Sequence, residues 1–296
     1  MAGQPMYAQR TLQGAFFLML AAAVCLLEAC ATQSPPISRD QIAAILSSPD
    51  RIGPDRINDL RRKPDQMLAF IGARPGMVAL DVSAAGGYTT ELLARAIGPT
   101  GVVYGQMPQR DPARAAPSPA APEGNSSGVA PVPAPAAAPA APRPTSAASL
   151  AERNARMKGA NVTAAPIVAV PQRFEDPVPP AVANGGLDLV TLMFNYHDLG
   201  FMGVDRAQMN RTIFRALKAG GVFVVADHAG RPGTGISESG TLHRVEESFL
   251  RSEVEAAGFK LVAEGDFLRN PNDPRDKNTP EPLQPKDEFV LKFIKP

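Results

Sequence analysis

Short apolar runs alternate with amphipathic stretches along most of this chain, and this alternation restricts its fold more than any other feature. The apolar run 77–82 is followed by a turn containing glycine and by an amphipathic stretch at 88–97. Further strands are predicted at 101–106, 167–170, 187–194, 221–226, 260–267 and 288–294, and further helices at 150–158, 206–217 and 245–257. Strands that alternate with helices predict a mostly parallel sheet covered on both faces.

Two short helices are predicted before the first strand. Ser38 is a typical capping residue for a helix that begins at Arg39. Pro64 opens a second helix at 64–70, because proline is favoured in the first turn.

The composition is typical of a globular protein with a substantial core, since 44% of the residues are hydrophobic and 20% are charged. Thirty lysines and arginines against 29 acidic residues give a net charge of +1, so no overall field attracts nucleic acid or an acidic partner. No basic patch is interleaved with aromatic residues. We therefore expect no nucleic-acid partner.

An apolar run near the N-terminus has the pattern of an export signal. It follows Arg10, covers 15–27 and leads into Leu-Glu-Ala-Cys, which closes at Cys30. Such a run is too short to span a bilayer comfortably, and a charged start with a small-residue finish is typical of a secretory signal. A plain signal peptide, or an uncleaved anchor with a chance cysteine, is the alternative.

The closing tetrapeptide resembles the lipobox of bacterial lipoproteins. The resemblance implies a lipoprotein signal peptide at 1–29, a lipidated Cys30 that attaches the protein to a membrane, and a tether at 30–37. Ala31 stands where an aspartate usually retains a lipoprotein in the inner membrane, so the outer membrane is favoured. We therefore expect an exported lipoprotein on the periplasmic side of the bacterial cell envelope.

A segment rich in proline and alanine interrupts the alternating pattern at about 107–148. Dense proline blocks both helix and sheet, and alanine offers too little apolar area to offset the entropy of ordering, so an extended, solvated insertion is predicted. A proline-rich ligand for a partner is the alternative. The segments on either side complete one pattern, so we expect a single domain at 38–296 that the insertion interrupts.

The turn after the first strand carries the most informative motif, which runs from Asp81 to Gly87. It resembles the first motif of the class I S-adenosylmethionine-dependent methyltransferases, D-x-G-x-G-x-G, although Ser83 and Ala85 replace two glycines. The resemblance implies S-adenosylmethionine as cofactor. The cofactor-binding residues that it implies are Asp81, Ser83, Ala85, Gly86, Gly87, Gln106, Phe194 and Asn195.

Three later segments carry the same resemblance. The strand 187–194 is similar to the family's fourth strand, 216–225 resembles its L-K-P-G-G turn with Ala219 in place of proline, and 255–259 is similar to the segment before its sixth strand. The resemblance implies a three-layer α/β/α, Rossmann-like methyltransferase fold with a seven-stranded, mostly parallel sheet and an antiparallel last strand. The three histidines, His197, His228 and His243, together with the loop 267–271 and the final strand 287–293, resemble a subgroup of predicted bacterial methyltransferases, many with export signals.

Residue 106 departs from the family pattern in a way that bears on the cofactor. The family usually has an aspartate or glutamate at the end of the second strand, where a carboxylate accepts both ribose hydroxyls. Gln106 can accept one hydroxyl but loses the charge-assisted part of the bond, about 1–2 kcal/mol. Ser83 and Ala85 also add side-chain atoms where backbone has to approach the ligand.

All three histidines follow predicted strands or begin helices on the expected ligand side. His197 or His228 is a candidate general base, with Asp198 or Asp227 orienting the ring, and His243 is a third catalytic candidate. The alternative is that Asp227 and His228 cap or pin the loop 230–240 while His197 bonds backbone.

A metal site from His197, Asp198, His228 and His243 is chemically allowed, but no spacing signature supports it, so no metal ligand is assigned.

Three functions follow from these patterns. The leading hypothesis is an S-adenosylmethionine-dependent methyltransferase that acts on an unidentified small molecule. Export would place the domain where this cofactor is not supplied, so the first alternative is a non-catalytic or repurposed methyltransferase fold that binds another ligand or partner. The second alternative is a metal-dependent site formed by the histidines.

Overall fold

A computed structural model describes residues 34–108 and 145–296, and its central feature is one seven-stranded sheet. The strand order is β3-β2-β1-β4-β5-β7-β6, and β7 runs antiparallel to both of its neighbours while the other pairs are parallel. The strands are β1 (Val78–Val82), β2 (Val102–Met107), β3 (Ile167–Pro171), β4 (Leu187–Met193), β5 (Leu217–His228), β6 (Lys260–Gly265) and β7 (Glu288–Ile294). The predicted fold class, a mostly parallel sheet with an antiparallel last strand, is therefore confirmed.

The described helices lie between the strands and before the first of them. They are α2 (Arg39–Ser47), α3 (Gly53–Arg62), α4 (Pro64–Ile71), α5 (Tyr88–Ile97), α6 (Ser146–Gly159), α7 (Tyr196–Phe201), α8 (Arg206–Ala216) and α9 (Glu247–Ala256), with a short 3-10 turn η1 (Pro180–Val182). The sequence pattern predicted most of these helices but neither α3 nor α7. Both missed helices contribute to the site described below.

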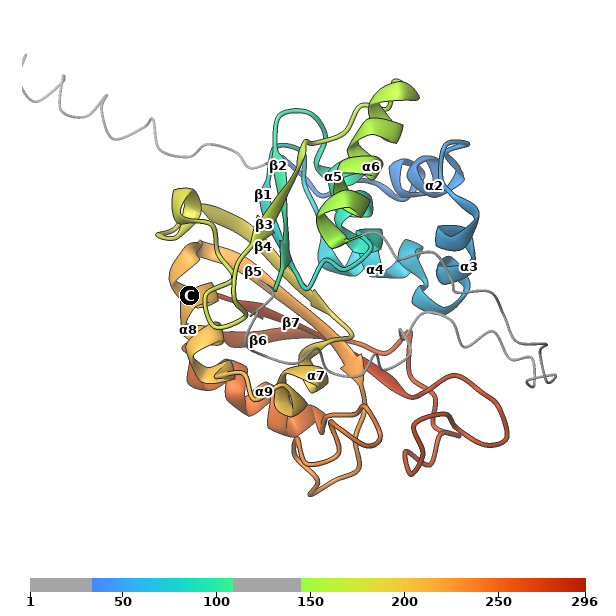
Figure 1. Cartoon of the computed structure of the whole chain (residues 1–296), viewed down its shortest axis with the longest axis vertical. Helices are drawn as coiled ribbons and strands as arrows, with labels where there is room; N and C mark the ends of the chain where they lie inside the picture. Colours follow the sequence, from blue (N-terminus) through green and yellow to red (C-terminus); the bar gives the residue numbers. More distant parts are fainter. Residues whose placement is uncertain (1–33, 109–144) are drawn as a thin grey trace, which may run out of the picture. The chain divides into compact units, whose positions relative to one another are not determined.

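Each face of the sheet packs against its own set of helices (Figure 1). One core joins Ala79 and Val224 to apolar residues of α2, α4, α5 and α6. The other joins Leu80 and Val225 to α7, α8 and α9. Because neighbouring residues of a strand point to opposite faces, β1 and β5 each supply both cores and are buried on both sides.

Local sequence explains the ends of two helices. Ser38 caps α2, as predicted. Its hydroxyl accepts a hydrogen bond from the backbone N–H of Gln41, and the Gln41 side-chain oxygen accepts one from the backbone N–H of Ser38. Thr145 is the N-cap residue of α6, and its hydroxyl accepts a hydrogen bond from the backbone N–H of Ala148. The described structure extends slightly into both ends of the insertion predicted at about 107–148, because Met107 pairs with Pro171 in the sheet and α6 begins at Ser146.

The predicted signal peptide 1–29, the lipidation site Cys30 and insertion residues 109–144 lie outside the described residues. Among the helices in the described ranges, none has the length and apolar character needed to cross a membrane.

Candidate functional site

The site lies at the carboxyl ends of β1 and β4, where the strand order reverses direction. Chain order runs outward from β1 through β2 to β3 on one side, and through β4 to β5 on the other. In open parallel sheets, ligands bind in the crevice at this switch point. Val82 and Met193 end the two strands, so the turn 83–87 and Phe194 border the crevice.

The turn after β1 holds a left-handed backbone at alternate residues. Ser83, Ala85 and Gly87 have φ angles of 59°, 47° and 78°. These are the positions at which the resembled family has glycine. A residue with a Cβ atom pays about 1–2 kcal/mol in this conformation, so the turn keeps the shape of a glycine-rich turn despite two side chains that oppose it.

The backbone of this turn is open to a ligand. Ala85 and Gly86 are exposed, and a Cβ atom built on Gly86 would meet no other atom within 4 Å. Beneath the turn, Gly87 is tightly packed, because a Cβ there would lie 2.6 Å from Leu150 and 2.8 Å from Arg153 of α6. The rigid underside and free upper side fit the cofactor that the resemblance implies.

Asp81 holds the base of the turn from inside the core. The side chain is 2% exposed, and its two oxygens accept hydrogen bonds from the hydroxyls of Thr90, at 2.6 Å, and Thr191, at 2.8 Å. Burial raises the pKa of Asp81 to about 6, against the opposing effect of the two hydroxyls. Asp81 therefore joins β1, β4 and α5 at a single buried carboxyl group.

Gln106 is used differently from the expectation that its amide accepts a ribose hydroxyl. It is fully buried, its Oε1 accepts from the Ser83 backbone N–H at 2.8 Å, and its Nε2 donates to the Gln172 carbonyl at 2.7 Å. An amide both accepts and donates, so it can join these two backbone groups, which a carboxylate cannot. In the structure, Gln106 therefore links the turn to the end of β3, and its contact with a ribose stays a prediction.

Phe194 directly follows β4 at the switch point and lines the small cavity described below. It is buried and has a φ of 60°, which is rare for a bulky residue. The guanidinium carbon of Arg62 lies 4.0 Å from the centroid of its ring, and that of Arg61 lies 5.2 Å away. Sequence reasoning missed Arg62, because it ends α3, a helix that the sequence pattern did not predict.

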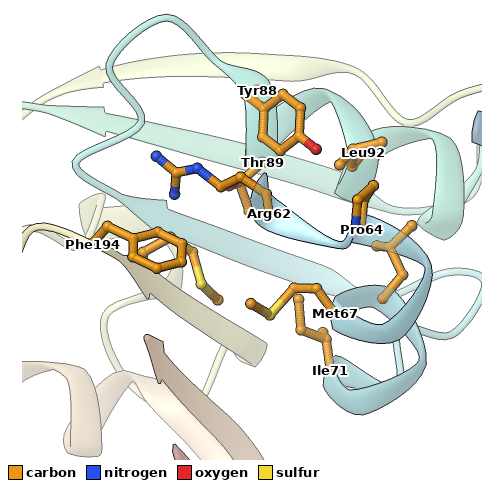
Figure 2. Close-up of a pocket in the computed structure, with 10 residues that line it drawn as sticks. Arg62, Pro64, Met67, Ile71, Tyr88, Thr89, Leu92 and Phe194 are labelled. Carbon is orange, nitrogen blue, oxygen red and sulfur yellow. The ribbon is translucent and has the colours of Figure 1, made fainter. Parts of the chain in front are cut away.

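A small cavity lies between α3, α4, α5 and the end of β4 (Figure 2). Figure 2 shows the Arg62 side chain extending toward Phe194, with Met67 and Ile71 of α4 below. The cavity has a volume of about 20 Å³, room for about one water molecule. A cofactor that extends from the turn to Phe194 therefore requires Arg62 to move, while the turn itself already fits.

The three histidines meet beyond β4 and β5, as the sequence predicted. The ring centroids of His197 and His228 are 5.4 Å apart, and those of His197 and His243 are 5.6 Å apart. His197 is on α7, His228 ends β5, and His243, with a φ of 51°, lies in the loop before α9. Their catalytic roles stay predictions.

His197 lies between two carboxylates. Its Nδ1 is 2.6 Å from Asp227 Oδ1, and its Nε2 is 3.1 Å from Asp198 Oδ1. Burial alone would lower the pKa of His197, but the carboxylates of Asp227 and Asp198 outweigh burial and raise it to about 10. A positive charge is therefore favoured at this position.

Asp227 and His228 are each held by neighbouring polar groups, and the alternative that they pin the loop 230–240 stays a prediction. Asp227 accepts from the backbone N–H groups of His197 and His228, both at 2.8 Å, and so fixes the start of α7. His228 Nδ1 lies 3.0 Å from Glu288 Oε1, which also binds Arg61 at 2.7 Å. Burial opposes ionisation of Glu288, yet His228 and Arg61 hold its pKa below the ordinary value.

Asn195 orients the side chain of Asp198 beside the histidines. Its Nδ2 donates to Asp198 Oδ2 at 2.8 Å, and Asp198 Oδ1 lies 3.1 Å from His243 Nδ1. The side chains of Asp198 and His243 are 27% and 17% exposed, whereas that of His197 is buried. Solvent or a substrate therefore reaches the cluster through Asp198 and His243.

Neither a known protein family nor a curated protein matches this chain. Among solved structures, it is similar to a SAM-dependent methyltransferase from Aquifex aeolicus, with 14% identity and a TM-score of 0.48 over 83% of this chain and 100% of that one. A TehB-like SAM-dependent methyltransferase from Corynebacterium glutamicum shares 15% identity, with a TM-score of 0.42 over 86% and 93% of the two chains.

Aeropyrum pernix fibrillarin, solved with natively bound S-adenosyl-L-methionine, shares 14% identity, with a TM-score of 0.39 over 74% of this chain and 67% of that one. The fold assignment for this chain stands on its own strand order and register.

Proposed function

We propose that this protein is an S-adenosylmethionine-dependent methyltransferase that acts on a small molecule. The proposal rests on the positions at which the backbone is strained. Among the described residues, seven non-glycine residues have a positive φ. Four of them lie in the turn after β1, directly after β4 or in the histidine cluster: Ser83, Ala85, Phe194 and His243. Strain of this kind persists where surrounding structure enforces it, and such places are often ligand sites.

The residues that would hold the cofactor are those of the exposed turn. Its upper face offers the exposed backbone of Ala85 and Gly86, and the N-terminus of α5 begins directly after it. When bound, S-adenosylmethionine supplies a methyl group on a positively charged sulfur. The chain contributes position, because Asp81 and Gln106 fix the turn from below and from the side.

His243 is the best-placed general base for an acceptor. It belongs to the part of the cluster that reaches solvent, and Asp198 Oδ1 lies 3.1 Å from its Nδ1. A carboxylate in that position orients an imidazole and stabilises its protonated form. Buried His197, with Asp227 behind it, would support Asp198 in turn.

A second candidate function, a methyltransferase fold that binds another ligand, is favoured by Gln106. Its polar atoms are committed to Ser83 and Gln172, so the usual ribose contact is replaced by a bond within the protein. The export pattern would add that the protein is an envelope lipoprotein attached through Cys30. Cell fractionation that finds the chain in the cytosol with residues 1–29 intact would contradict export.

Isothermal titration of the full-length protein with S-adenosylmethionine and S-adenosylhomocysteine tests the proposal. The sharpest variant is Gly86→Val, because space is open above Gly86 and the fold should tolerate the side chain while a ligand at the turn would not. Gly159→Val is the matched control, since Gly159 is also exposed with open space around it but lies at the end of α6.

We expect saturable binding that Gly86→Val weakens at least tenfold and that Gly159→Val leaves unchanged. The proposal would be refuted if neither ligand bound at concentrations up to about 1 mM. A Kd of about 1 mM corresponds to a binding free energy of only about 4 kcal/mol.

A further inference from the structure

We propose that His197, Asp198 and His243 bind a divalent transition-metal ion of the zinc and iron(II) class. The three side chains come from two segments distant in sequence, α7 and the loop before α9. Each offers one ligand atom, and these atoms all lie within 4.8 Å of one another. The proposal shares these three residues with the acceptor side of the proposed function, where a bound ion would replace His243 as the base, but it does not involve the turn that would hold the methyl donor. Metal binding and methyl-donor binding can therefore fail independently.

The distances around Asp198 match those of a metal site. Asp198 Oδ1 lies 3.1 Å from His197 Nε2 and 3.1 Å from His243 Nδ1. Bonds from zinc to nitrogen and oxygen are about 2.0–2.2 Å long, so neighbouring ligand atoms lie roughly 3.0–3.5 Å apart. Both measured distances fall in this range. His243 sits in a loop, so a small movement of its ring brings the two imidazoles to the same ion.

Each of the two ligands on α7 is already oriented by another group. Asp227 Oδ1 accepts from His197 Nδ1 at 2.6 Å, which turns Nε2 of the same ring toward Asp198. Asn195 donates to Asp198 Oδ2 and leaves Oδ1 facing both imidazoles. A carboxylate behind a metal-binding histidine is the usual means of fixing its tautomer and direction. The candidate site therefore includes Asp227 and Asn195, which orient two of its three ligands.

The donor set selects the class of ion. Two imidazoles and one carboxylate favour zinc or iron(II), whereas magnesium and calcium prefer oxygen ligands alone. Three protein ligands leave coordination positions for water or for a substrate. The partial exposure of Asp198 and His243 places those positions toward solvent.

His228 is excluded from the site, although the sequence placed it among the possible ligands. Its Nδ1 lies against Glu288, which is also paired with Arg61. The chain has only these three histidines, so His228 is a matched control: it is the same residue type, with its ring centroid 5.4 Å from that of His197.

The experiment uses the full-length chain without a polyhistidine tag and with Cys25→Ser and Cys30→Ser, which remove its only thiols. The protein is stripped with a chelator and titrated with Zn²⁺ by calorimetry and with Co²⁺ by visible absorption. We expect one ion per chain. His243→Ala and Asp198→Asn should each lower the Zn²⁺ affinity at least 100-fold, Asp227→Asn should lower it about 10–100-fold, and His228→Gln should leave it within about threefold.

Circular dichroism melting of each variant separates loss of the site from loss of the fold, and partly exposed His243 provides the variant that should fold normally. Three outcomes would overturn the proposal: no saturable Zn²⁺ binding, unchanged affinity in a folded His243→Ala protein, or an equal loss in His228→Gln. None of these readouts depends on methyl transfer.

Discussion

Replacing Asp81 with asparagine should make the protein more stable at neutral and alkaline pH. The Asp81 carboxyl group is 2% exposed, and the two hydroxyls that contact it belong to Thr90 and Thr191. Burial raises its pKa from 3.8 to about 6, so near pH 8 the core holds an ionised carboxylate. Asparagine has nearly the same shape, and its amide can accept from one hydroxyl and donate to the other because hydroxyls rotate.

The magnitude follows from linkage between protonation and folding. The interval between 3.8 and about 6 corresponds to about 3 kcal/mol. Because the folded-state pKa is raised, the stability contributed by protonated Asp81 is fully present below pH 3.8 and is lost as the pH rises through about 6. Asp81→Asn mimics the protonated form at every pH. It should therefore gain up to ~3 kcal/mol near pH 8 and almost nothing near pH 4.

Urea unfolding followed by circular dichroism, repeated from about pH 4 to about pH 8, measures this difference. Asp65→Asn is the control, since Asp65 is exposed in the first turn of α4, and its effect should stay within ~0.5 kcal/mol at every pH. A wild-type protein that is more stable than Asp81→Asn near pH 8 would refute the reasoning. That result would mean that ionised Asp81 stabilises the fold through Thr90 and Thr191.

Four further predictions concern other parts of the site and its support. Glu91→Gln should cost about 3–5 kcal/mol in urea unfolding, because Glu91 is buried and pairs with Arg95 at 2.8 Å and Arg153 at 2.5 Å; a loss below ~1 kcal/mol would contradict a tightly coupled cluster. Arg62→Ala should tighten S-adenosylmethionine binding in calorimetry, because the guanidinium over Phe194 no longer has to be displaced; weaker binding would show that Arg62 contacts the ligand. In chelator-treated protein, the stability contributed by His197 should be full below pH 6.5 and fall as the pH rises toward about 10, and His197→Gln should flatten this slope in thermal melts; an unchanged slope would contradict the raised pKa. Ala85→Gly should raise the unfolding free energy by up to ~1 kcal/mol through relief of its left-handed backbone, and a clear loss would show that the conformation is not strained.

The sequence predicted the parts of the fold that depend on apolar periodicity. The helix expected at 88–97 and the strand expected at 288–294 have those bounds in the structure. The histidine cluster was predicted for a similar reason, because residues that follow parallel strands gather at one edge of the sheet. Neither result required knowledge of side-chain contacts.

The helix α3 could not be predicted, because it has no buried apolar face. Ile57 and Leu60 are 60% and 82% exposed, and the residue that α3 buries is Asp55, through an ion pair with Arg153 at 2.7 Å. Those partners are 98 positions apart in the chain, and no local pattern reveals such a pair. The position of Arg62 over Phe194 was missed for the same reason.

The two bonds of the Gln106 side chain limit how this site can evolve. Changing Gln106 to glutamate, the residue type expected in the resembled family, would keep the bond from the Ser83 N–H but would set a carboxylate oxygen against the Gln172 carbonyl. Two acceptors at the present separation of 2.7 Å repel each other, and the partly buried carbonyl would lose its donor, which costs up to about 1–3 kcal/mol. Glutamate at position 106 would therefore be better tolerated together with a second substitution that moves the Gln172 carbonyl, so the residues at 106 and 172 are expected to change together.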